Sequence, residues 1–200
     1  MTSDELTEHF PVDPGHLARL HARLEQAAQD RDLLDIAYHT VDSAVGSLLL
    51  AATAQGLVRV AFASEDHDHV LLALAERISP RLLKAPARLD PVARQLDEYF
   101  TGRRSRFDVA LDWSLSQGFR RTVLEHLNND VSYGSTASYA ALAQLSGSPK
   151  AVRAVGTACA TNPIPIVVPC HRVIRSDGTV GAYRGGSVAK RALIDLERHL

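Results

Sequence analysis

Several residue types and segments are scarce in this chain of 200 residues, and each scarcity excludes a class of protein. The two cysteines, Cys159 and Cys170, stand alone in otherwise cysteine-free sequence, which is no framework for disulfide bonds. No run of about eighteen apolar residues occurs, as a membrane span would need, and the acidic start, residues 1–11, is unlike a secretory signal. We therefore expect a cytoplasmic protein with two reduced thiols and no membrane partner.

The net charge is also small, at −1, but it hides an asymmetry along the chain. Residues 1–115 carry 12 Lys and Arg against 18 Asp and Glu, whereas residues 116–200 carry 10 against 5. A surface that binds a polyanion would therefore lie in the C-terminal part. Charge also drifts along many chains without meaning, and the offset alone does not separate the two interpretations.

Residue patterning predicts an N-terminal helical extension, 1–35, followed by an α/β lobe, 36–115. Apolar residues at helical spacing predict one helix over 15–35, and Asp90 followed by Pro91 predicts that a later helix, 91–99, begins there. A helix is also expected over 68–78. Apolar or alternating segments predict a small antiparallel sheet, with a tight turn at Gln55-Gly56 and an edge strand at 107–111; its other strands are 36–40, 46–53 and 57–62.

Turn-forming residues at 114–118 predict the boundary to a mostly helical lobe, 116–200. Its predicted helices are 119–127, 138–145, 149–161 and 188–200. Ser148 and Pro149 are expected at the N-cap and first position of the third. The second and third helices, joined by Ser146-Gly147-Ser148, form a helix-turn-helix candidate, although many helical hairpins bind no DNA.

The third helix of this lobe has an unusual composition. Its small residues are Ala151, Ala154, Gly156, Thr157, Ala158 and Ala160, and it also carries Lys150 and Arg153. Small residues let a helix backbone approach a neighbour closely. That neighbour is more often another helix, but with Arg153 projecting, a DNA groove is the sharper alternative.

The segment 162–173, NPIPIVVPCHRV, carries the chemistry. Its two early prolines exclude a helix, and the apolar run 166–168 is expected to be buried, which places Cys170 at the end of a rigid strand. His171 and Arg172 are expected to lower the pKa of the neighbouring thiol, and the thiolate is the nucleophilic form. A buried structural cysteine is the alternative, and the neighbouring residues disfavour it.

At this segment the chain closely resembles the O6-alkylguanine-DNA alkyltransferases, whose signature Pro-Cys-His-Arg-Val stands here at 169–173 after Asn162-Pro163. The likeness covers most of 119–197 and continues more weakly over 38–111. It implies a first lobe resembling ribonuclease H, an α/β fold overall, double-stranded DNA with O6-alkylguanine as partner, and O4-alkylthymine as a second substrate. It further implies a monomer, no cofactor, no metal, and a protein consumed in one turnover.

The resemblance also implies roles for individual residues. Cys170 would attack the alkyl carbon, with its proton removed through a water by His171, which Glu197 polarises. Tyr139 would assist departure of the base. Arg153 would fill the stack left by the flipped base, with the third helix in the minor groove. Asn162 would fix the local backbone, Val173 and Tyr183 would line the base pocket, and Lys190 would support it.

Some positions depart from the family pattern, among them Arg184, where smaller residues are common, so the pocket mouth is expected to be narrower or more cationic. Cys159 is either a second acceptor or a packing thiol. Residues 1–35 have no recognised counterpart and supply no four-cysteine zinc site. A metal site at His67 and His69 is disfavoured because no further ligands accompany them. Two other functions stay open: a non-catalytic lesion-binding relative, which would lack the acceptor cysteine, and a cysteine hydrolase.

Overall fold

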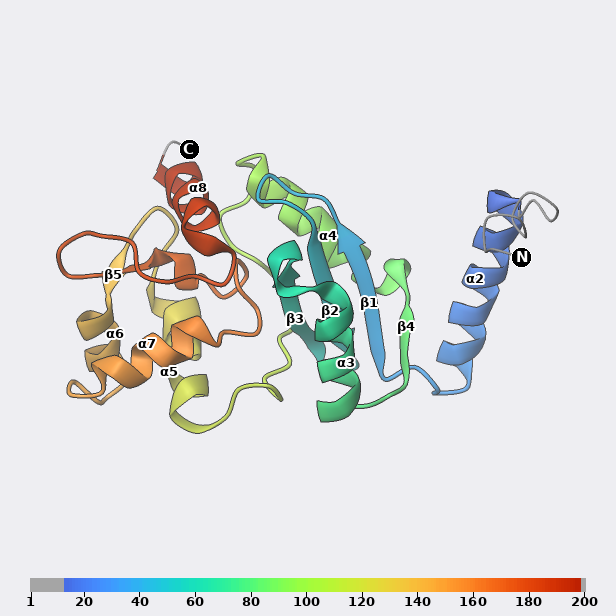
Figure 1. The fold of residues 1–200 in the computed structure, drawn as a ribbon, viewed down its shortest axis with the longest axis horizontal. Coiled ribbons are helices and arrows are strands. Elements are labelled where there is room, and N and C mark those ends of the chain that lie inside the picture. Colours follow the sequence, from blue (N-terminus) through green and yellow to red (C-terminus); the bar gives the residue numbers. More distant parts are fainter. Residues whose placement is uncertain (1–12, 199–200) are drawn as a thin grey trace, which may run out of the picture.

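The computed structural model describes residues 13–198, and the first lobe in it is built on a four-stranded sheet (Figure 1). The strands are β1 (Ile36–Val41), β2 (Leu48–Thr53), β3 (Gly56–Phe62) and β4 (Leu82–Lys84), in the order β3-β2-β1-β4. The first three pair antiparallel, as expected, and β4 adds parallel to β1, so the sheet is mixed. Three residues are too few to carry a periodic signal, which is why the sequence did not predict β4.

Both faces of the sheet are buried. Alternate residues such as Leu48, Leu50, Val60 and Phe62 join one apolar cluster, while Leu49, Ala51 and Ala61 join another. Helix α4 (Pro86–Phe100) contributes to the first cluster, and α3 (His67–Arg77), after the short 3₁₀ turn η1 (Ala63–Glu65), contributes to the second. The two-residue period of a strand thus places a layer of helix on each side of the sheet (Figure 1).

Helix α4 begins five residues earlier than the sequence predicted. Pro86, not Pro91, stands at its start, and Asp90 with Pro91 lies inside the helix. Pro91 gives up one helical hydrogen bond because it has no N–H. Four buried side chains stabilise the helix in spite of that loss: Leu89, Val92, Leu96 and Tyr99.

The predicted edge strand at 107–111 does not form. The segment makes a one-residue parallel bridge, in which the N–H of Leu57 donates to the carbonyl of Ala110 and the N–H of Asp112 donates to the carbonyl of Leu57. The side chain of Gln95 takes up both backbone groups of Asp108, so no ladder continues. Gly56, with φ of +141°, faces this bridge, and a Cβ there would collide with the Ala110 carbonyl.

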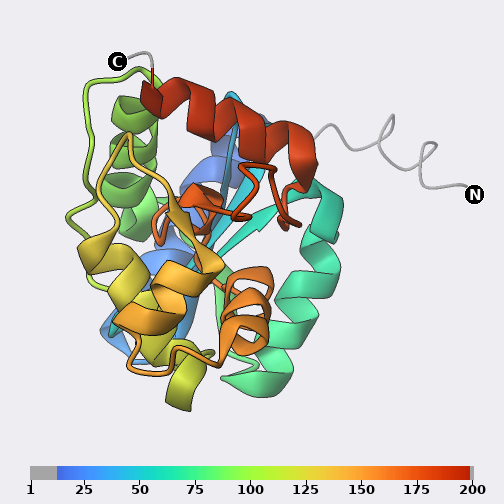
Figure 2. The same ribbon diagram turned by 90° about the vertical axis from the view of Figure 1, so that its left-hand side faces the viewer.

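The C-terminal part contains α5 (Gly118–Asp130), α6 (Tyr139–Leu145), α7 (Val152–Ala160) and α8 (Gly186–Arg198), with the two-residue strands β5 (Ala137–Ser138) and β6 (Val173–Ile174). Ser138 caps α6, since its side chain accepts a hydrogen bond from the N–H of Ala141. Ser148 does not cap α7: residues 148–151 form a separate turn, and the helix begins three residues later than expected. Figure 2 shows α5, α6 and α7 gathered below α8.

The N-terminal helix α2 (Pro14–Asp30) stops five residues short of the predicted end and lies beside β4 (Figure 1). Within 13–198 no helix has the length and apolar character needed to cross a membrane. Residues 1–12 and 199–200, which include the expected end of the last helix, lie outside the described part. One apolar cluster runs from β2 and β3 through α4 and α5 to α8, so the segment around Cys170 sits where both halves of the chain pack together.

Candidate active site

The segment that carries Cys170 is a folded turn, not the extended strand that the sequence predicted. The N–H of Val168 donates to the carbonyl of Ile164 at 2.9 Å, and Cys170 opens the 3₁₀ turn η2 (Cys170–Arg172). Ile166 has φ of +73°, a strained conformation for a β-branched residue that persists only where the surroundings impose it. The alternation of side chains along a strand therefore does not govern where Cys170 and His171 point.

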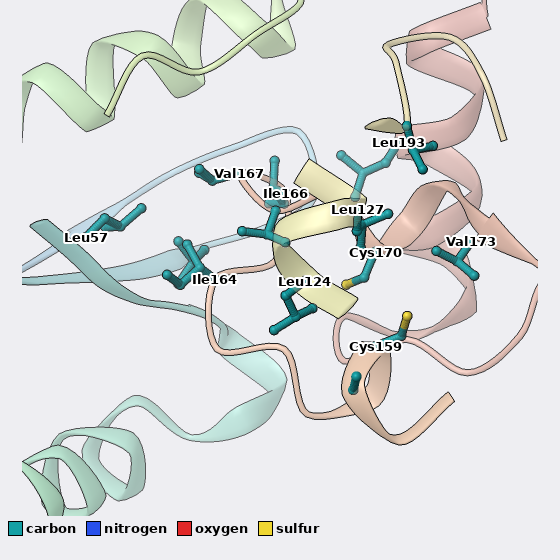
Figure 3. Packing of buried hydrophobic residues seen from close by; sticks show 14 of the residues in the cluster. Leu57, Leu124, Leu127, Cys159, Ile164, Ile166, Val167, Cys170, Val173 and Leu193 are labelled. Carbon is teal, nitrogen blue, oxygen red and sulfur yellow. The ribbon is translucent and has the colours of Figure 1, made fainter. Parts of the chain in front are cut away.

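Asn162 ties this turn to the sulfur. Its Nδ2 donates to the Val168 carbonyl at 2.9 Å and to Cys170 Sγ at 3.1 Å, while its Oδ1 accepts from the N–H of Ile164 at 3.0 Å. The amide side chain is fully buried, as is nearly all of Cys170, which is 2% exposed. A donor aimed at the sulfur favours the thiolate over the thiol. Figure 3 shows Cys170 among the buried apolar side chains around it.

Burial dominates the acidity of Cys170. It raises the pKa of the thiol to about 11, against the smaller lowering effects of the Asn162 hydrogen bond and the Lys190 charge. Lys190 is itself fully buried and donates from Nζ to the Val173 carbonyl at 2.6 Å. The sequence predicted that His171 and Arg172 lower the pKa of the thiol, but they do not do so. The resting thiol therefore needs a base.

A buried polar network lies behind that thiol. His171 Nε2 is 2.9 Å from Glu197 Oε1, and Arg172 donates from Nε to Glu197 Oε2 at 2.8 Å and from Nη2 to Oε1 at 3.0 Å. Tyr99 of α4 donates from its hydroxyl to Glu197 Oε1 at 2.7 Å. Burial raises the pKa of Glu197, but the bonds from His171 and Arg172 outweigh it and bring the pKa down to about 2.

His171 is therefore held neutral and oriented. Burial lowers its pKa more than the hydrogen bond and charge of Glu197 raise it. An ionised carboxylate beside Nε2 keeps the proton on that nitrogen, which leaves the lone pair on Nδ1. Nδ1 is buried and has no hydrogen-bond partner among residues 13–198. This geometry gives the site one base atom that is free to take a proton.

The aromatic residues expected at the base pocket lie around the same centre. Tyr183 packs edge-on against Phe62, at 5.5 Å between ring centroids, and against His171 at 6.4 Å. Tyr139, the first residue of α6, is half-buried, and its pKa is raised by burial and by the nearby Cys159 and Cys170 sulfurs.

Helix α7 sorts its small residues onto two faces. Val155, Ala158 and Cys159 are buried, while the outer face is exposed and carries Arg153, Ala154, Thr157 and Ala160. A Cβ added at Gly156 would meet no atom within 4 Å, so the protein's own packing does not require a glycine there. The helix thus has room for something outside the protein to approach its backbone.

Two family models match the chain: 6-O-methylguanine DNA methyltransferase, ribonuclease-like domain, over residues 36–113, and 6-O-methylguanine DNA methyltransferase, DNA binding domain, over residues 118–199. The chain belongs to the 6-O-methylguanine DNA methyltransferase family. The resemblance drawn from the segment around Cys170 is thereby confirmed, and so is the α/β fold with a helical C-terminal lobe.

Individual relatives of the 6-O-methylguanine DNA methyltransferase family agree over most of the chain. The methylated-DNA–protein-cysteine methyltransferase of Mycolicibacterium paratuberculosis is 39% identical over 163 residues, which are 82% of this chain and 93% of the relative. The inducible enzyme of that name from Bacillus subtilis is 37% identical over 150 residues, covering 74% of this chain and 83% of the relative. The crystal structure of Mycobacterium tuberculosis OGT in complex with DNA matches with a TM-score of 0.70 at 36% identity, covering 82% and 93%.

Sequence reasoning missed one member of this site, Tyr99, and gave another, Arg172, the wrong role. Tyr99 lies on a helix 98 residues before its partner Glu197, and no local pattern points to it. Arg172 belongs to the signature, but it turns away from the sulfur toward Glu197 and the Val131 carbonyl, to which Nη1 donates at 2.6 Å. A buried arginine is almost always paired with a carboxylate. That general rule is the only signal from which the structural role of Arg172 could have been suspected.

Cys159 lies in the last turn of α7, and its side chain points toward the region of Cys170 (Figure 3). Burial raises its pKa more than that of Cys170, and no hydrogen bond to its sulfur appears in residues 13–198. The geometry favours the packing role over a second acceptor. Around His67 and His69, and elsewhere in the described residues, no group of three or more metal-binding side chains occurs.

Proposed function

We propose that this chain repairs alkylated DNA by moving the alkyl group of O6-alkylguanine onto Sγ of Cys170. Its relatives are named methylated-DNA–protein-cysteine methyltransferases, and alkyl transfer to a cysteine is the activity that family membership assigns. One observation carries the assignment to Cys170: it is a nearly inaccessible thiol that accepts a hydrogen bond from Asn162 and lies beside the neutral base His171.

The proton of Cys170 passes through a water to His171 Nδ1, the free lone pair of the network. Glu197 stays ionised, because its pKa of about 2 is far below that of the imidazole, and it stabilises the imidazolium that forms. The thiolate then attacks the alkyl carbon, so that an S–C bond forms while the C–O6 bond breaks. The bonding electrons leave with guanine. The hydroxyl of Tyr139 donates to a ring nitrogen of the departing base and limits the charge that develops there.

DNA binding falls to α7, whose exposed small residues allow the backbone into a minor groove. Arg153 occupies the space in the stack that the flipped base vacates. Val173 and Tyr183 line the pocket that receives the base, and Lys190 supports it through its hydrogen bond to the Val173 carbonyl. Minor-groove contacts read sequence poorly, which suits a protein that must act wherever a lesion arises.

Because nothing removes the alkyl group from a thioether, one protein molecule is spent per lesion. The substrate range extends to O4-alkylthymine, which presents an alkylated oxygen in the same plane of a flipped base. The protein acts as a cytoplasmic monomer without a cofactor. Its chain divides into the extension 1–35, the lobe 36–115 and the DNA-binding and active-site lobe 116–200.

The test is the intact mass of the protein after incubation with a duplex that holds one O6-methylguanine. The natural protein gains one methyl group, Cys170→Ser gains none, and Cys159→Ser, with a matched buried thiol removed, gains one. Tight lesion binding with no mass change in the natural protein would contradict the proposal and favour a non-catalytic lesion binder. Repeated turnover of an ester or peptide by Cys170 would favour a hydrolase instead.

A further inference from the structure

A cluster of charges joins the first lobe to the loop that follows Tyr183. Arg184 donates from Nη1 to Glu65 Oε2 and from Nε to the carbonyl of Ala160, at the end of α7, at 3.1 Å. The same Glu65 oxygen accepts from Arg59, whose other nitrogen donates to the Pro163 carbonyl at 3.2 Å. The Glu65 carboxylate of the first lobe is thus connected, through Arg59, to Pro163 before Cys170. Through Arg184 it is connected to the loop after Cys170.

The loop also rests on Phe62 of the same lobe. Tyr183 packs edge-on against the Phe62 ring, and a Cβ at Gly185 would collide with that ring. Glu65 Oε1 accepts from the N–H of Phe62 at 3.0 Å, so the carboxylate fixes the backbone that carries this ring. Tyr183 is therefore held between Phe62 and His171, with the residue next to it anchored by Glu65.

The charges make Glu65 the member on which the others depend. The Arg59 and Glu65 side chains are 8% and 13% exposed, and that of Arg184 is 30% exposed. Burial raises the pKa of Glu65, but the charge of Arg59 and the hydrogen bonds from Phe62 and Arg184 outweigh it. The pKa is lowered overall, and the carboxylate is ionised at neutral pH. Without that charge the buried Arg59 has no carboxylate partner, and the partly exposed Arg184 side chain can turn toward water.

We propose that Glu65 is a positioning residue for alkyl transfer, which acts through Arg184 to hold Tyr183 and its loop as a fixed wall of the base pocket. Arg184 is then an anchor directed at the first lobe and not a cation at the pocket mouth. The proposal rests on the proposed function, since it assigns the first lobe a part in the same reaction. The first lobe does not touch the reacting atoms. It sets the position of the wall against which the flipped base is oriented.

The experiment compares Glu65→Gln with the natural protein in two measurements. The single-turnover rate of methyl transfer from an O6-methylguanine duplex is expected to fall about tenfold, because a base misplaced by a fraction of an ångström reacts slowly. The affinity for an unmodified duplex is expected to change less than about twofold, because the Glu65 side chain bonds to Arg59, Phe62 and Arg184 and to no exposed residue of α7. The rate of labelling by free O6-benzylguanine, which reports the pocket without DNA, falls with the first rate.

Asp35→Asn is the matched control. Asp35, just before β1, forms an ion pair at 2.6 Å with Arg81 of the first lobe, outside the active-site network. The Asp35→Asn substitution removes a carboxylate that binds an arginine but leaves the loop after Tyr183 in place. It should therefore change neither the rate of methyl transfer nor the rate of labelling. Thermal unfolding of both variants shows how much stability each substitution costs. If Asp35→Asn loses as much stability as Glu65→Gln but keeps the natural transfer rate, lost stability does not explain the slower transfer by Glu65→Gln.

A double-mutant cycle separates positioning from general support of the fold. Arg184→Ala alone should slow transfer about as much as Glu65→Gln, and the double variant should be no slower than either single one. Arg184→Lys should restore part of the rate. Equal slowing by Glu65→Gln with and without Arg184 would overturn the inference, as would an unchanged rate in Glu65→Gln. Failure of the natural protein to gain a methyl group would instead overturn the proposed function.

Discussion

Tyr99 and Glu197 lie near the ends of helices α4 and α8 and meet through a hydrogen bond of 2.7 Å. The same carboxylate accepts from His171 and from the fork of Arg172. The orientation of the base in the second half of the chain therefore depends on a hydroxyl from the first half. This contact makes the network a connection between the two halves of the chain as well as the proposed proton path.

Replacing Glu197 by Gln is expected to affect both roles. The neutral amide no longer fixes the His171 proton on Nε2, so the transfer rate should fall by about a hundredfold, the lower end of the range for general base catalysis. It also leaves the buried Arg172 without its counter-charge, at a cost of about 3 kcal/mol in the free energy of unfolding.

Single-turnover kinetics and urea unfolding measure the two effects. Asp195→Asn is the control, because Asp195 lies on the same helix but is exposed. Transfer by Glu197→Gln at the natural rate would show that the carboxylate does not orient the base.

The pH dependence of the rate follows from His171 and Cys170. Burial lowers the pKa of His171 from the usual histidine value of 6.5, so the imidazole is neutral at pH 6.5 and above. The transfer rate should therefore not change with pH just above 6.5. Below that pKa the imidazole is protonated and the rate should fall tenfold per pH unit. Toward pH 11 the rate should rise again, because burial has raised the pKa of the Cys170 thiol to about 11 and the thiol then ionises without help.

Rates of methyl transfer from about pH 4 to about pH 11 measure this profile. His171→Gln should lack the acid limb and keep the alkaline rise. A single rise through the ordinary pKa of cysteine, with nothing near that of histidine, would contradict the role of His171.

Asn162→Ala is expected to loosen the turn that carries Cys170. It leaves the Ile164 N–H and the Val168 carbonyl without their partner in a buried place, which should cost about 2 kcal/mol of folding free energy. It also removes the donor to Sγ, so the pKa of the thiol should rise above about 11 and the transfer rate should fall about tenfold. Denaturant unfolding and rate measurements test both, with the exposed Asn129→Ala as control.

The methylated protein is expected to be less stable than the fresh one. Cys170 is 2% exposed and packed among apolar side chains, so a new methyl group has to displace neighbours, at a cost of about 1–3 kcal/mol. Thermal unfolding before and after one equivalent of lesion duplex should show a lower midpoint once the duplex is removed. An unchanged midpoint would mean that the site already has space for the methyl group.

The sequence predicted the parts of this protein that depend on local pattern. The strands β2 and β3 follow from their apolar runs, α6 from the helical pattern over 138–145, and the importance of Cys170 from the signature around it. Pro91 misled the prediction of α4, because tertiary burial of Leu89 and Tyr99 outweighs one lost hydrogen bond. The short strand β4 exists only because β1 offers it an edge.

The active site shows the same division. The resemblance named Cys170, His171 and Glu197, and the structure brings the last two together at 2.9 Å. No reasoning along the chain could show that 162–169 folds into a turn with a strained Ile166, since that conformation is imposed by contacts such as the one from Val60 N–H to the Pro163 carbonyl. Tyr99 and Glu65 act across long sequence separations, where patterns carry no information.

The outer edge of β3 is occupied by residues 110–112 and by the segment that leads to Cys170. Its backbone groups at Leu57 and Val60 bond to 110–112 and to Pro163, so no free strand edge is offered to another molecule there. Such edges, when open, recruit strands from neighbouring chains and start aggregates. The segment that holds Cys170 therefore also shields the sheet, because the carbonyl of Pro163 occupies a backbone donor of β3 that would otherwise be open to another chain.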